Sequence, residues 1–275
     1  MATTLGPSPA RNVPTGTARM LARIEGAIGW IVFNNPERHN ALSRDMWEAL
    51  PRLVTALCAE PEIRLLVLKG TGDKAFVSGA DISEFETERA TPEAVSRYDA
   101  LVEHATDTLA ACPRPTIAMI HGHCMGGGLA VAMACDLRLA TEESGFAIPA
   151  AKLGVGYRAS GLKTLVDLVG PSFAKEIIFT ARRFTADEAR TMGLVNRVVP
   201  AATLEGLVRD YARAIGDNAP LTIEATKQLI HELVRSDGPD AARCDALIER
   251  CFKSADYIEG RRAFMEKRRP RFTGK

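Results

Sequence analysis

The chain is organised around residues 121–136, His-Gly-His-Cys-Met-Gly-Gly-Gly-Leu-Ala-Val-Ala-Met-Ala-Cys-Asp. The apolar residues 115–120 before it are typical of a short buried strand, and residues 129–134 after it are small, apolar and compatible with a helix. The order predicts a strand, a glycine turn and a buried helix. Glycines leave the first N–H groups of a helix uncovered, and these donors can stabilise a negative charge. Close packing of helix on strand would also explain the glycines.

A second glycine turn follows another predicted strand. Residues 65–69 (Leu-Leu-Val-Leu-Lys) are apolar enough for a strand, and the loop after them runs to Gly79 and Ala80. Two such turns, each after a strand, could aim two backbone N–H groups at one oxygen. That arrangement stabilises an oxyanion.

Several motifs then point to a known family. They are residues 75–85 (Ala-Phe-Val-Ser-Gly-Ala-Asp-Ile-Ser-Glu-Phe), 122–128, 135–136, 35–36, 40–42, 189–199 and 264–272. In their order and spacing they resemble the enoyl-CoA hydratase/isomerase (crotonase) superfamily. The resemblance covers nearly the whole chain beyond about residue 15.

The resemblance implies an α/β fold, a right-handed spiral of ββα units followed by a C-terminal α-helical region. We expect a disordered leader over residues 1–17 and a spiral acyl-CoA-binding core over 18–200. Residues 201–275 are expected to form helices that serve oligomerisation and cover CoA. Without the resemblance, alternating strands and helices would favour a doubly wound parallel sheet.

The resemblance also implies the site residues. Members of the family bind an acyl-CoA and hydrogen-bond its thioester oxygen with two backbone N–H groups, which fall here at Ala80 and Gly127. CoA is the only cofactor-like group expected, as part of the substrate. The residues expected to bind substrate are Arg38, Ala41, Ala80, Asp81, Ile82, Ser83, Gly126, Gly127, Arg158 and Lys267. Asp81 could instead cap the short helix after its loop.

The chain departs from the family at the two glutamates that hydratases use to add water. Their positions fall at Ala130 and Ala150, neither of which can give or take a proton. Each general acid or base contributes roughly 10²–10⁴ in rate. We therefore expect ordinary hydratase activity to be severely impaired.

A local resemblance to methylmalonyl-CoA decarboxylase suggests which residues could replace the two missing glutamates. That enzyme has a tyrosine at the Tyr157 position, which meets the substrate carboxylate, and Arg158 could bind a second carboxylate as a charged fork. Loss of CO₂ forms the enolate without a base. Against this, that decarboxylase has His at the Ala80 position and Glu at the Ala130 position. Tyr157 and Arg158 could also simply face solvent.

Composition sets the remaining bounds. The 275 residues are 46% hydrophobic and 25% charged with a net charge of +1, so they give no argument for nucleic-acid binding. No apolar run is long enough to span a membrane. The six cysteines and five histidines show no metal-site spacing, so we expect no metal and reduced thiols in a cytoplasmic protein.

Three functions stay open from the sequence. The first is an enoyl-CoA hydratase/isomerase-like lyase or isomerase that stabilises a thioester enolate. The second is an acyl-CoA decarboxylase of the methylmalonyl-CoA type, and the third is a non-catalytic protein that binds CoA thioesters. The family resemblance implies a homotrimer or homohexamer.

Overall fold

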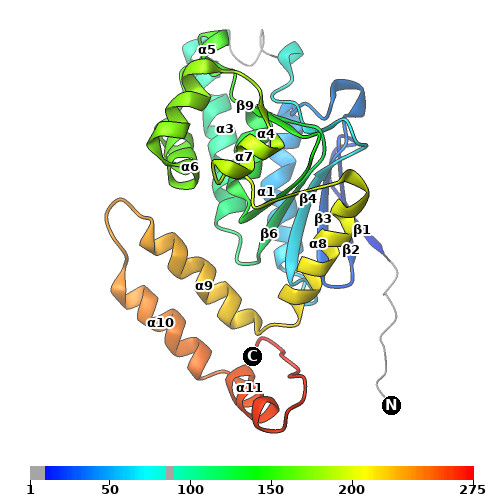
Figure 1. Cartoon of the computed structure of the whole chain (residues 1–275), viewed down its shortest axis with the longest axis vertical. Helices are drawn as coiled ribbons and strands as arrows, with labels where there is room; N and C mark the ends of the chain where they lie inside the picture. Colours follow the sequence, from blue (N-terminus) through cyan, green and yellow to red (C-terminus); the bar gives the residue numbers. More distant parts are fainter. Residues whose placement is uncertain (1–9, 85–89) are drawn as a thin grey trace.

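The computed structural model of the chain describes residues 10–84 and 90–275. Two β-sheets and a set of helices form the body, and three further helices extend from it at the C-terminal end (Figure 1). No helix among the described residues is long and apolar enough to cross a membrane.

The larger sheet has seven strands in the order β1-β2-β3-β4-β6-β8-β11. The first two pairs are antiparallel and the remaining pairs are parallel. Its strands are β1 (Arg11–Val13), β2 (Met20–Glu25), β3 (Ile28–Phe33), β4 (Leu65–Gly70), β6 (Thr116–Ile120), β8 (Leu137–Thr141) and β11 (Arg197–Val199). Strands β2 and β3 form a hairpin around the turn at Gly26 and Ala27.

A smaller sheet of four strands has the order β10-β9-β7-β5. Its strands are β5 (Ala75–Val77), β7 (His123–Met125), β9 (Gly145–Ala147) and β10 (Phe184–Thr185). The pairs β5–β7 and β7–β9 are parallel. Because these strands have two or three residues each, their side chains show too little alternation to be recognised in the sequence.

The two sheets confirm the predicted spiral. The chain repeatedly places one strand in the large sheet, the next strand in the small sheet, and then a helix: β4, β5 and α3, then β6, β7 and α4, then β8, β9 and α5. The fold class is therefore the crotonase-type α/β spiral, and the doubly wound alternative is wrong.

Alternating residues of the large sheet face two different helical layers. Trp30, Val67 and Met119 lie in a core formed with α8 (Ala201–Gly216). Their neighbours Ile31 and Leu68 lie in the main core, on the side of α1, α3 and α4. This alternation follows from the two-residue period of a strand and buries the central strands on both faces.

The other helices surround the two sheets or follow them in the chain. Their bounds are α1 (Arg44–Cys58), α3 (Pro92–Ala110), α4 (Gly127–Ala134), α5 (Ala150–Leu153), α6 (Ala159–Thr180), α7 (Ala186–Thr191), α9 (Pro220–Leu233), α10 (Ala241–Phe252) and α11 (Ala255–Met265). Helix α1 runs through Pro51, and α6 is kinked at Gly170, whose φ is 75°. Thr185 forms a capping box with Glu188 at the start of α7, as expected for this residue pair.

The C-terminal helices α9, α10 and α11 extend away from the spiral (Figure 1). The last residues then fold back, because the Asp256 carboxylate accepts hydrogen bonds from the N–H groups of Thr273 and Gly274. The Arg64 guanidinium also donates to the carbonyl of Phe272 at 3.4 Å.

The N-terminal segment needs one correction. Arg11–Val13 forms the edge strand β1 against Ala22–Ile24 of β2, so this part of the expected disordered leader is ordered. Residues 1–9 of that leader, and Phe85 of the family motif, lie outside the described residues. The domain boundaries at residues 17 and 200 stay predictions.

Candidate active site

The two glycine turns predicted from the sequence meet at one edge of the small sheet. Val77 of β5 pairs with Cys124 of β7 in parallel register. Ala80 and Gly127 each lie three residues beyond these partners, so the register carries both turns to the same edge. A Cβ added to Gly126 would lie 3.9 Å from Gly79 Cα, which shows how closely the turns approach.

Leu42 holds the first turn from one side. Its N–H donates to Gly79 O and its carbonyl accepts from Asp81 N–H, both at 2.8 Å. In this parallel bridge the N–H of the residue between them, Ala80, faces away from Leu42. Within the described part of the chain, Ala80 N–H has no hydrogen-bond acceptor.

The second turn begins helix α4. Gly126 has φ 49° and ψ −115°, a conformation that favours glycine, and its N–H bonds Ala147 O of β9 at 2.9 Å. Gly127 is the first residue of the helix, where N–H groups have no partner inside the helix. A Cβ on Gly128 would lie 2.3 Å from Val77 O, so only glycine fits against β5.

A cavity of about 220 Å³ opens beside these turns. Ala80, Gly126 and Gly127 form one side of it, and Ala130 and Ala150 line it as well. The cavity therefore brings together the two predicted oxyanion donors and the two predicted glutamate positions.

Aromatic side chains form a second part of the wall. Trp47 of α1 is buried, and its ring packs against Gly127, where an added Cβ would lie 3.1 Å from Trp47 Cζ2. Trp47 Nε1 donates to the hydroxyl of Tyr98 on α3 at 3.0 Å. Both side chains line the cavity, so this bond joins the turn at Gly127 to the wall that α3 forms.

Tyr157 lines the cavity from the loop before α6. Its ring packs on Gly161, because a Cβ added to Gly161 would lie 2.9 Å from Tyr157 Cε1. Burial raises the pKa of the Tyr157 hydroxyl to about 12. The hydroxyl is therefore protonated at neutral pH and can donate a proton or a hydrogen bond, but it cannot serve as a base.

Arg158 also lines the cavity, but its guanidinium is already engaged. Arg158 Nε and Nη2 both donate to Asp99 Oδ2 on α3, at 2.9 and 2.7 Å. The expectation of a free fork for a substrate carboxylate is therefore not met in this structure, since the Asp99 carboxylate occupies that position.

Comparison with known proteins agrees with this geometry. The family model described as "Enoyl-CoA hydratase/isomerase" matches residues 23–275. The chain belongs to the enoyl-CoA hydratase/isomerase family.

Individual relatives of this family match over nearly their full length. The crotonyl-CoA hydratase of Syntrophomonas wolfei is 35% identical over 252 residues, covering 91% of this chain and 96% of its own. The methylmalonyl-CoA decarboxylase of Escherichia coli is 33% identical over 248 residues, covering 89% of this chain and 94% of its own. The solved structure of an enoyl-CoA hydratase/carnithine racemase from Magnetospirillum magneticum has a TM-score of 0.91 and 38% identity, covering 94% and 97%.

The family binds acyl-CoA substrates, and the structure gathers several of the residues expected to hold them. Arg38 Nη1 donates to the Asp81 carboxylate at 2.8 Å and to Ser83 Oγ at 2.7 Å. Asp81 also accepts from Ser83 N–H, which fulfils its predicted capping role. Ile82 is 72% exposed beside them, whereas Ala41 is buried under the same loop.

Lys267 does not join this group within one chain. It follows α11, which lies at the opposite end of the molecule from α5 (Figure 1), and α5 contributes Ala150 and Leu153 to the cavity. Its neighbour Arg268 is paired with Glu259 at 2.6 Å and Glu266 at 2.5 Å. The resemblance placed Lys267 at the site, and the arrangement within one chain does not bring it there.

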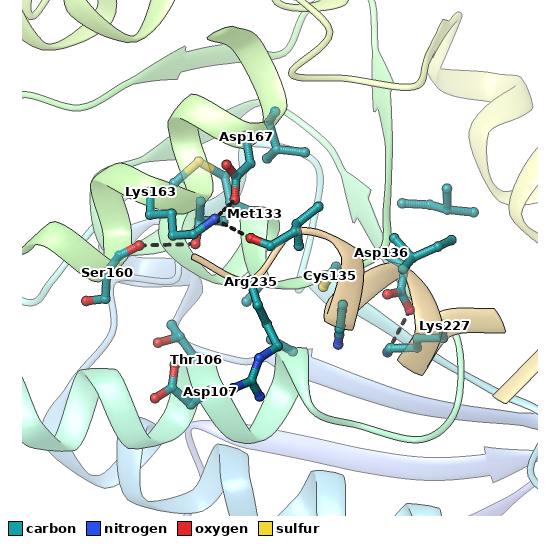
Figure 2. Close-up of a pocket in the computed structure, with 18 of the residues that line it drawn as sticks. Thr106, Asp107, Met133, Cys135, Asp136, Ser160, Lys163, Asp167, Lys227 and Arg235 are labelled. Atoms are coloured by element: carbon teal, nitrogen blue, oxygen red, sulfur yellow. Dashed lines mark hydrogen bonds and ion pairs between the residues drawn. The ribbon is translucent and has the colours of Figure 1, made fainter. Parts of the chain in front are cut away.

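A larger groove of about 1000 Å³ lies between α9 and the spiral (Figure 2). Lys227 of α9 bonds Asp136 at 2.8 Å, and Lys163 of α6 bonds Asp167 at 2.6 Å. These pairs lie on the walls of the groove, which shares Ala130 with the smaller cavity. We place the site in the smaller cavity, because both glycine turns face it.

Sequence reasoning missed the contribution of α3. Tyr98, Asp99 and Glu103 line the cavity from this helix. Their spacing puts Asp99 and Glu103 on one helix face, but an exposed helix would carry the same pattern. Only the packing of α3 over the glycine turns shows which face meets the cavity. Among the described residues, no three His, Cys, Asp or Glu side chains are grouped to hold a metal ion.

Proposed function

We propose that this family member polarises the thioester carbonyl of an acyl-CoA with the N–H groups of Ala80 and Gly127 and stabilises the resulting enolate. The observation that supports this proposal is the shared register of β5 and β7, which brings the turns at Ala80 and Gly127 to one cavity. Removing one donor of such a pair costs about 2.7–4 kcal/mol of activation energy.

The proton chemistry of the proposed site differs from that of a hydratase. If Ala130 and Ala150 stand at the two glutamate positions, no carboxylate is available there to activate water. The neutral Tyr157 hydroxyl can protonate an enolate carbon but cannot remove an α-proton. Without a base at these two positions, the site suits reactions that form the enolate by losing a group other than a proton.

The proposal also covers the residues that contact CoA, the oligomeric state and the cellular compartment. Arg38, Ala41, Asp81, Ile82 and Ser83 would contact the CoA moiety, with Lys267 supplied by a neighbouring subunit of a homotrimer or homohexamer. We place the protein in the cytoplasm, in keeping with its six unpaired cysteines.

A gain-of-function experiment tests the proton chemistry. Hydration of crotonyl-CoA by the wild type is expected to be slower than by a hydratase that has both glutamates by at least the factor of roughly 10²–10⁴ that one such group contributes. The double variant Ala130→Glu, Ala150→Glu should hydrate crotonyl-CoA at a measurably higher rate than the wild type. The loss of absorbance of the conjugated thioester follows the reaction. Ala151→Glu, an exposed neighbour outside the cavity, is the control and should gain nothing. Hydration at ordinary family rates by the wild type would refute the proposal for Ala130 and Ala150.

Decarboxylation is the second candidate, favoured by the position of Tyr157 in the cavity. Loss of CO₂ supplies the enolate electrons, and Tyr157 could protonate the α-carbon. The paired state of Arg158 counts against a dicarboxylic substrate. Release of CO₂ from methylmalonyl-CoA tests this function. Binding of both acyl-CoA compounds without turnover would support the third function, a CoA-thioester-binding protein.

A further inference from the structure

The charge of the cavity wall gives information about the acyl group itself. Three charged side chains line the cavity among the described residues: Asp99, Glu103 and Arg158. Arg158 and Asp99 neutralise each other in an ion pair at 2.7 Å. One negative charge, that of Glu103, is left over.

Glu103 differs from Asp99 in having no partner. Among residues 10–84 and 90–275, its carboxylate has no hydrogen-bond or ion-pair partner, although its backbone carbonyl accepts from Thr106 Oγ1. The side chain is solvent-accessible, so it can carry its charge without a protein cation. It lies one helical turn from Asp99 on the same face of α3.

The field around Glu103 is negative as well. Asp107 lies one turn further along α3, and burial together with the charge of Glu103 raises the pKa of Asp107. His104, the other titratable neighbour on this helix, opposes that shift only weakly. Across the cavity, the one cation that lines it among the described residues, Arg158, is bound to Asp99.

We propose that Glu103 selects an acyl group that carries a positive charge or a hydrogen-bond donor on its chain, and that it disfavours one ending in a carboxylate. The proposal rests on the proposed binding of acyl-CoA at Ala80 and Gly127. With the thioester oxygen held by these amides, the acyl chain lies in the 220 Å³ cavity within the wall that α3 provides. A cation on that chain forms an ion pair with Glu103, whereas a distal carboxylate meets the unpaired negative charge.

Three acyl-CoA probes of matched length test this selection. They are 4-trimethylammoniobutyryl-CoA, its neutral carbon isostere 5,5-dimethylhexanoyl-CoA, and the anionic glutaryl-CoA. Their dissociation constants would be measured by isothermal titration calorimetry at low salt. We expect the cationic probe to bind roughly fivefold more tightly than the neutral one, the upper end for a partly exposed ion pair, and glutaryl-CoA to bind most weakly. Added salt should reduce these ratios.

Variants test whether Glu103 is responsible for the preference among these acyl-CoA probes. Glu103→Gln should bring the ratio between cationic and neutral probes close to one, and Glu103→Lys should favour glutaryl-CoA. Glu93→Gln, an exposed position of α3 outside the cavity, is the matched control and should keep the wild-type ratio. Equal binding of the three probes by the wild type, or a preference that survives Glu103→Gln, overturns the inference alone. Binding of no acyl-CoA at all overturns the proposed function and this inference with it.

Discussion

At the scale of single residues, glycine does two different things in the central motif. Gly126 supplies a backbone conformation that other residues avoid, and Gly128 supplies space. Both properties can be anticipated from the letters Gly-Gly-Gly, but their division cannot, because it depends on where β5 passes the helix. The contact between Gly128 and Val77 joins segments that are far apart in the sequence.

We predict that Gly128→Ala destabilises the protein by about 1–3 kcal/mol, the usual cost of an extra methyl group in a packed core. The added methyl would lie 2.3 Å from Val77 O and 2.6 Å from Val77 Cβ, and a backbone atom cannot turn aside. Urea unfolding measures the free energy. Gly206→Ala is the control, since nothing lies within 4 Å of that position in α8 and alanine favours the helix. Equal stability of the Gly128 and Gly206 variants would contradict the argument.

At the scale of elements, α1 and α3 are joined at two places. The Trp47–Tyr98 hydrogen bond lies at the cavity, and the thiols of Cys58 and Cys112 lie 3.1 Å apart at the other end of the pair. The hydrogen bond between the thiols lowers the pKa of Cys58 and raises that of Cys112. Cys58 is therefore the thiol that ionises first and acts as the nucleophile when the pair is oxidised.

We predict that mild oxidation with diamide joins Cys58 to Cys112, with two hydrogens passing to the diamide. The disulfide would close a loop of 54 residues, and by the chain-entropy model it would add up to about 4 kcal/mol of stability. Peptide mapping under non-reducing conditions identifies the link, and thermal unfolding measures its effect. Cys244→Ser should form the same disulfide, whereas Cys58→Ser should form none. Linkage of Cys244 to Cys251 in place of this pair would refute the prediction.

The elements also show what sequence could and could not predict. The hairpin at Gly26, the helix after the glycines and the capping box at Thr185 follow from local signals, and all three are present. The small sheet was missed because β5, β7 and β9 are too short to display a period. Arg158 was assigned to the substrate because its partner Asp99 is 59 residues away on another helix.

At the scale of the whole molecule, the C-terminal helices leave apolar side chains uncovered in a single chain. Phe264 is 81% exposed, Met265 80% and Phe252 60%. Exposed apolar groups of this size gathered in one region are typical of a protein–protein interface. They agree with the expected oligomer, which would also be needed to bring Lys267 to a site.

We predict a mass of three or six chains in solution, measured by size-exclusion chromatography with light scattering. Phe264→Asp should lower that mass, because it places a charge in the expected interface. Leu21→Asp, at an exposed position of strand β2 and outside the C-terminal helices, is the control and should leave the assembly intact. A monomeric wild type at micromolar concentration would show that the apolar face has another role.

The parallel pairing of β5 with β7 has a consequence for how this protein could acquire new chemistry. Neighbouring strands are about 4.8 Å apart, so the backbone alone sets the spacing of the two N–H groups that would donate to a carbonyl. The proposed donors are both backbone groups and not side chains. Residues such as Ala130, Ala150 and Glu103 can therefore be exchanged to redirect the reaction or its substrate, while the polarising framework is inherited unchanged.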